Sequence, residues 1–111
     1  MIPTASAWTY LAIAGLLEVG WAISMKYSAG LTRLGPTAAT FLMGFASFYF
    51  LAQATKQLPI GTAYAVWTGI GAVGTALLGM ILFGEPRHGV RLASILLIVM
   101  GIVGLRLFST P

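Results

Sequence analysis

Four long apolar stretches, separated by short segments that contain glycine and proline, constrain this chain more than any other feature. An α-helix rises about 1.5 Å per residue, so about 20 apolar residues cross the hydrocarbon core of a bilayer. The fourth stretch is long enough only if Arg91 and Arg106, near its ends, extend toward water. We predict an all-α membrane protein with a single domain over residues 1–111. Its four transmembrane helices are expected at about residues 5–26, 36–55, 59–83 and 90–108.

The composition excludes most functions of soluble proteins. Only 7% of the 111 residues are charged, whereas soluble domains carry about 25%. The net charge is +4, but the basic residues are scattered between apolar stretches, so we expect no nucleic-acid partner. The chain has no cysteine and one histidine, and it shows no catalytic side-chain set or phosphate loop. We therefore expect a protein that is embedded in lipid, is not an enzyme and has no metal or cofactor.

One of the two acidic residues, Glu18, lies inside the first apolar stretch. It is about 12 Å along the helix from Lys26, where a charge costs about 2.5–3.5 kcal/mol. We expect no basic residue at the same depth, so Glu18 is either protonated or paired with a cation from outside. Alternation between these states is the core of a proton-coupled antiporter; a structural hydrogen bond between helices is the alternative. The other acid, Glu85, is interpreted as a surface charge beside Arg87.

Small and aromatic residues near Glu18 are candidates for a cation site. Gly15 and Trp21 lie one helical turn from Glu18, where they offer space and an aromatic wall. Tyr64 and Trp67 share one face of the third stretch, where Tyr64 can bond a carboxylate and Trp67 can stack on a planar cation. The alternative is that both aromatic side chains only pack between helices.

Further small and polar residues lie in the other stretches. Ser47 can hydrogen-bond a substrate or the buried glutamate, or it can bond back to its own helix. Gly69 and Gly71 either bend the third helix or allow close packing. Ser94 and Gly101 are seven residues apart on one face, a spacing that favours a contact between helices.

Four helices with one membrane-embedded acid are few for a transporter, because secondary transporters work with two halves around a midplane site. Two antiparallel copies of this chain would supply both halves. The charge distribution permits both orientations, since the positive-inside bias is weak. One side would carry Lys26, Arg33, Arg87 and Arg91, and the other Lys56 and Arg106.

The chain resembles the small multidrug resistance family along nearly its whole length. The segments that carry the resemblance are LLEVGWAISMKYS, GLTRLGP, LPIGTAYAVWTGIGAVGTALLG, FGEPR and LASILLIVMGIVGL. Trp21, three residues after Glu18, and the segment GTAYAVWTGIGAVG resemble the guanidinium-exporter subtype. The resemblance implies an antiparallel, dual-topology homodimer in a bacterial inner membrane. It would export guanidinium and some substituted guanidinyl cations in exchange for protons, with the proton gradient as its energy source.

The resemblance also implies roles for individual residues. Glu18 would bind the proton and the cation, Trp21 would flank it, and Gly15 would leave space beside it. Ser47, Tyr64 and Trp67 would complete a polar and aromatic pocket. Gly69 and Gly71 would form a helix bend, and Ser94 and Gly101 a dimer contact. One departure is Gly20, where the subtype more often has a larger aliphatic residue, so broader selectivity is expected. Two alternatives stay open: export of quaternary ammonium and other lipophilic cations, or a non-catalytic membrane partner subunit.

Overall fold

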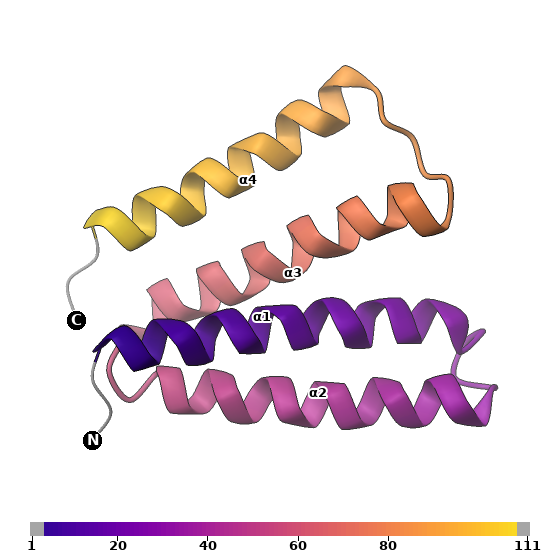
Figure 1. Cartoon of the computed structure of the whole chain (residues 1–111), viewed down its shortest axis with the longest axis horizontal. Coiled ribbons are helices and arrows are strands. Elements are labelled where there is room, and N and C mark those ends of the chain that lie inside the picture. Colours follow the sequence, from indigo (N-terminus) through magenta and orange to yellow (C-terminus); the bar gives the residue numbers. More distant parts are fainter. Residues whose placement is uncertain (1–3, 109–111) are drawn as a thin grey trace.

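The computed structural model describes residues 4–108, so the outermost ends of the predicted domain lie outside the described residues. The four predicted helices are present and run alternately up and down (Figure 1). Every boundary lies within two residues of its predicted position. The helices are α1 (Thr4–Tyr27), α2 (Leu34–Ala54), α3 (Ile60–Leu82) and α4 (Gly89–Phe108).

All four helices are long and apolar enough to cross a membrane. They contain between 20 and 24 residues, which corresponds to about 30–36 Å of helix. Proline and glycine mark the connections: Pro59 directly precedes α3, and Gly84, two residues after the end of α3, takes a positive φ of 64°. The predicted set of four transmembrane helices therefore matches the observed one.

The helices α1, α2 and α3 form the packed part of the molecule. The buried side chains of this core come from the first half of α1, the end of α2 with the turn after it, and the first half of α3. They are Ala7, Leu11, Ala14, Leu51, Ala54, Leu58, Ala63, Val66 and Trp67. The many alanines in this set let the helix backbones approach closely, as is common in membrane bundles.

The fourth helix stands apart from this core. Figure 1 shows α4 on the far side of α3 from α2, and among the described helices its backbone packs against α3 alone. No residue of α4, all of which the structure describes, is buried. One face of this apolar helix is therefore available to lipid or to another protein surface.

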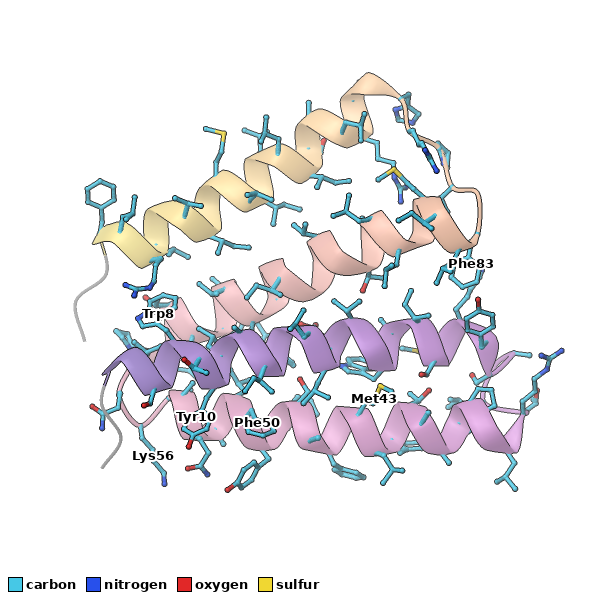
Figure 2. All side chains as sticks on the ribbon, in the orientation of Figure 1. Trp8, Tyr10, Met43, Phe50, Lys56 and Phe83 are labelled. Atoms are coloured by element: carbon cyan, nitrogen blue, oxygen red, sulfur yellow. The ribbon has the colours of Figure 1, made fainter. Side chains whose placement is uncertain are left out.

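Basic and aromatic side chains meet at both ends of the bundle (Figure 2). At one end, the Arg106 guanidinium of α4 lies 4.8 Å from the ring centroid of Trp8 on α1. At the other end, the Lys26 ammonium lies 5.8 Å from the centroid of Phe83. Such cation–π contacts let the charged groups remain near water while their side chains cover apolar surface.

Candidate functional site

Glu18 is the fifteenth residue of α1, about 21 Å from the start of the helix and about 14 Å from its end. Its side chain points to α3, where it lies directly against Gly71. A Cβ atom at Gly71 would overlap with Glu18 Oε1 and would lie 2.8 Å from Glu18 Cγ. The buried glycine of α3 thus provides the space that the carboxylate occupies.

Glu18 and Trp21 line a cleft of about 410 Å³ between α1 and α3. Glu18 Oε1 and the indole Nε1 of Trp21 are both buried, and neither has a hydrogen-bond partner within residues 4–108. Buried polar atoms are nearly always hydrogen-bonded in folded proteins. An acceptor and a donor without partners, three residues apart on one helix, therefore mark this cleft as the candidate binding site.

No basic side chain pairs with Glu18 in the described part of the chain. The single ion pair there joins Arg91 Nη2 to Glu85 Oε1 at 2.7 Å. Both residues line the cleft that Glu18 lines, and Glu85 is 39% exposed, so it is a paired, partly exposed charge at this cleft rather than a free surface charge. The physical reason is that the loop after α3 folds back on the helix, which a sequence pattern does not reveal. Arg91 likewise turns toward Glu85, and its side chain is only 28% exposed.

Ser47 connects three helices instead of contacting Glu18. Its hydroxyl group donates a hydrogen bond to the carbonyl oxygen of Ala14 on α1, at 2.7 Å. The same oxygen accepts a hydrogen bond from the Trp67 indole on α3, at 2.8 Å. Of the three partners considered from the sequence, neither the glutamate nor the serine's own helix is observed, and a bond to substrate stays a prediction. In this chain, Ser47 fixes the relative positions of α1, α2 and α3.

The two aromatic residues of α3 have different environments. Trp67 is buried, with the rings of Phe48 and Tyr64 each 5.5 Å from its own centroid. Tyr64 is 56% exposed, and it is not among the described residues that line the cleft of Glu18. One chain therefore brings Trp21 to Glu18 but not Tyr64 or Trp67. Their role in substrate binding stays a prediction.

Side chains of neighbouring helices occupy the space beside two glycines of α1. A Cβ at Gly15 would lie 2.6 Å from Ile70 Cγ2 on α3, so the space at Gly15 serves helix packing. A Cβ at Gly20 would overlap with the sulfur of Met43 on α2, which Figure 2 labels between the two helices. The space beside the carboxylate comes from α3, whereas the sequence interpretation placed it at Gly15.

The glycines of α3 also serve close approach. A Cβ at Gly69 would lie 2.9 Å from Ile102 Cδ1, so Gly69 is where α4 packs on α3. The helix α3 is uninterrupted through Gly69 and Gly71, and the predicted bend stays a prediction. Ser94 and Gly101 are both exposed on α4, where Ser94 donates back to the carbonyl oxygen of Val90 at 2.8 Å. Their predicted dimer contact lies on this uncovered helix.

A second, apolar cleft lies on the other side of Trp21, along α2. Its volume is about 260 Å³. It is lined by Trp21, Thr40, Phe41, Gly44, Phe45 and Phe48. Sequence reasoning missed this cleft, although the spacing of Phe41, Phe45 and Phe48 on one helical face is a signal for it. Trp21 therefore forms a wall between a polar cleft and an aromatic one.

Comparison with known proteins decides the family. A family model described as Small Multidrug Resistance protein matches residues 6–98. The chain belongs to the small multidrug resistance family. Similar relatives are each named guanidinium exporter. The protein of Yersinia pestis is 58% identical over 103 residues, which cover 93% of this chain and 99% of the relative. That of Escherichia coli K12 is 55% identical over 101 residues (91% and 96%), and that of Proteus vulgaris 52% over 103 residues (93% and 99%).

Membership in the small multidrug resistance family agrees with the resemblance found in the sequence. Together with the four candidate spans, it makes this family member a multi-pass membrane protein. The family match covers α1 from residue 6 onward and all of α2 and α3, and with them both clefts and Glu18.

Proposed function

We propose that this protein is a proton-coupled antiporter that exports guanidinium and small substituted guanidinyl cations across a bacterial inner membrane. The observation that carries the proposal is the Glu18 carboxyl group, which lies deep in the membrane span with its buried Oε1 unpartnered by any described residue. The adjacent Trp21 indole is equally without a partner there. The names of relatives that are 55–58% identical support guanidinium as the substrate.

The chemistry of the site suits a guanidinium ion. This cation is planar and weakly hydrated, and its parallel N–H groups match the two oxygens of a carboxylate. It also stacks favourably on an indole ring, which Trp21 offers at the same cleft. A cation that brings hydrogen-bond donors compensates for the loss of water around Glu18 better than a simple ion does.

Coupling to protons follows because both ligands compete for one carboxylate. A protonated Glu18 cannot bind a cation, and a Glu18 that holds guanidinium cannot hold a proton. With two copies of Glu18 in a dimer, one monovalent cation would displace two protons. The inward proton gradient then drives export without any other energy source or cofactor.

An antiparallel homodimer would complete the transporter. The uncovered face of α4 gives a second copy a surface to pack on, with Ser94 and Gly101 as the contact residues. Because the chain has no cysteine, a His88→Cys variant carries one labelling site in the exposed α3–α4 loop. Dual topology predicts that an impermeant thiol reagent labels about half of the molecules in sealed right-side-out vesicles. Labelling of all molecules or of none would contradict it.

Reconstituted transport tests the proposed function. Purified protein in liposomes should move guanidinium against a proton flux that a pH-sensitive dye inside the vesicles reports. Glu18→Gln has nearly the same shape without the titratable group, so it should abolish both fluxes. Coupled transport by Glu18→Gln, or no transport by the chain alone, would overturn the proposal. The second of these outcomes is what a non-catalytic partner subunit predicts.

The apolar cleft along α2 favours a second candidate function, the export of lipophilic quaternary ammonium cations. Such ions have no N–H donors and depend on aromatic and apolar surface, which Phe41, Phe45 and Phe48 provide beside Trp21. Competition between guanidinium and a tetraalkylammonium ion in the same vesicles separates the two candidates. The guanidinium proposal predicts the larger flux for the planar ion.

A further inference from the structure

Two glycines bring Glu85 back onto α3, although it belongs to the loop after this helix. Gly84 takes the left-handed backbone conformation that reverses the chain. The backbone N–H groups of Phe83 and Glu85 then both donate to the carbonyl oxygen of Gly79, at 3.0 and 3.3 Å. A Cβ at Gly79 would overlap with the Glu85 carboxylate. The loop is therefore built so that this carboxylate lies directly on the surface of α3.

The first turn of α4 presents a guanidinium group to this carboxylate. Arg91 Nη2 donates to Glu85 Oε1 at 2.7 Å, while Arg91 Nε is buried without a partner among residues 4–108. Arg91 is 28% exposed and Glu85 39% exposed, so the pair is reached by water. The side chain of Arg91 ends in the same chemical group as the proposed substrate, and Glu85 already binds it.

The two carboxylates of the chain share one cleft and one helix surface. Glu18 lies against Gly71 and Glu85 lies against Gly79, eight residues further along α3, which corresponds to about 12 Å. Between them, the cleft is lined by small side chains of α3, including Thr75. No bulky side chain of α3 separates the Glu85 carboxylate from the Glu18 carboxylate.

We propose that Glu85 is a second, outer binding site for the guanidinium group on the way to Glu18, and that Arg91 occupies it when substrate is absent. The inference rests on the proposed function and adds a step to it. An incoming guanidinium ion replaces the Arg91 side chain on Glu85, and Arg91 moves toward water. The exchange leaves no buried charge unpaired, because one guanidinium group takes the place of another.

The same exchange gives the outer site a selectivity. A quaternary ammonium ion has no N–H donors and cannot reproduce the hydrogen bonds that Arg91 makes to Glu85. While Arg91 remains in place, its positive charge also repels other cations at the mouth of the cleft. The outer site therefore favours guanidinyl compounds before they reach Glu18.

A purely structural role for the pair predicts a different pattern of variants. If Glu85 and Arg91 only held α4 against α3, removal of either partner would lower the stability of the protein, and any effect on guanidinium binding would have the same sign. A competitive site predicts opposite effects, because loss of Arg91 frees the outer carboxylate whereas loss of Glu85 destroys the site. The sign of the effect on guanidinium binding distinguishes the two roles.

Calorimetric titration of purified protein with guanidinium chloride tests the outer site at Glu85 while the inner site is removed by Glu18→Gln. A Glu18→Gln/Arg91→Gln double variant should bind guanidinium, and addition of Glu85→Gln should abolish the binding. The matched control is Glu18→Gln/Arg87→Gln. Arg87 is a cation of the same loop that donates to the Met80 carbonyl oxygen at 3.2 Å, so its loss should leave guanidinium binding no stronger than in Glu18→Gln alone, whereas loss of Arg91 should strengthen it. Absence of binding in the Glu18→Gln/Arg91→Gln protein would overturn the outer site, whatever the unmodified protein does.

Nuclear magnetic resonance of ¹⁵N-labelled arginine covers the case in which loss of Arg91 unfolds the protein. In a Glu18→Gln variant, guanidinium should shift the Arg91 Nε resonance, and tetramethylammonium should not. An unchanged Arg91 signal at high guanidinium concentration refutes the inference. In transport, Glu85→Gln alone should raise the KM roughly fivefold with little change in kcat. Failure of the unmodified protein to transport guanidinium would instead overturn the proposed function, and the calorimetry keeps the two failures distinct.

Discussion

Gly71→Ala is the substitution that most directly tests whether α3 positions the Glu18 carboxyl group. The added Cβ would lie 2.8 Å from Glu18 Cγ, whereas nonbonded carbon atoms pack at about 3.5–4.0 Å. The glutamate side chain must therefore move by about 1 Å or take another rotamer. A displacement of that size at a reacting group can cost about a hundredfold in rate. We expect Gly71→Ala to lower proton-coupled guanidinium transport by about ten- to a hundredfold.

The control for this substitution lies on the same helix. A Cβ at Gly61 would meet nothing within 4 Å, so Gly61→Ala makes the same chemical change in open space. Alanine also favours a helix over glycine by about 1 kcal/mol, so neither variant should lose stability through helix propensity. Both proteins are reconstituted at equal density, and initial rates of guanidinium uptake are compared after their thermal unfolding has been measured.

A second substitution separates a displaced carboxylate from general damage. Aspartate is shorter than glutamate by one methylene group, so Glu18→Asp makes room for the new methyl group at Gly71. We expect the Gly71→Ala/Glu18→Asp protein to be no worse than Glu18→Asp alone, because the two changes act on one contact. Unchanged transport by Gly71→Ala would refute the conclusion that Gly71 provides the space for the Glu18 carboxylate. Strictly additive losses of transport rate in the double variant would refute it as well.

Three further outcomes are expected. Ser47→Ala leaves the buried Trp67 indole without its acceptor and should cost about 1–3 kcal/mol, so a thermal unfolding midpoint at or above that of the unmodified protein would contradict the bridge between helices. Gly101→Leu adds bulk to the uncovered face of α4 and should shift the protein toward monomer in light scattering after size exclusion; an unchanged dimer would exclude Gly101 from the contact. Gly20→Ala displaces only the flexible end of Met43 and should change the stability by less than about 1 kcal/mol; a larger loss in thermal unfolding would show that this part of the α1–α2 interface is rigid.

The helices could be predicted from the sequence because their signals are local. The length of each apolar stretch and the breakers between them set where a helix begins and ends, without reference to the rest of the chain. Glu18 could also be found locally, since a carboxyl group in a membrane span stands out in any arrangement of the helices. Trp21 followed from its spacing, because residues three apart share a helix face.

Contacts between helices could not be predicted in the same way. Gly15, Gly69 and Gly71 all carry the same local signal, a small residue in an apolar helix, yet each faces a different partner in the fold. Which glycine leaves space for the carboxylate depends on the rotation of α3 relative to α1. Ser47 shows the same limit, because its hydroxyl bonds a carbonyl group 33 residues away in sequence. Long-range geometry decides these roles, and a short pattern does not contain it.

The first turn of α4 connects the uncovered face of this helix with the Glu85 carboxylate. Arg91 lies in the first turn of α4, and Ser94 follows three residues later, so a partner chain packed along Ser94 and Gly101 would contact the turn that carries the arginine. Movement of Arg91 away from Glu85 then depends on how α4 is held. In a dimer, substrate exchange at the mouth of one cleft would therefore be sensitive to the packing of the two copies. A Gly101→Leu protein that still transports as a monomer, with the same KM for guanidinium, would show that this dependence does not exist.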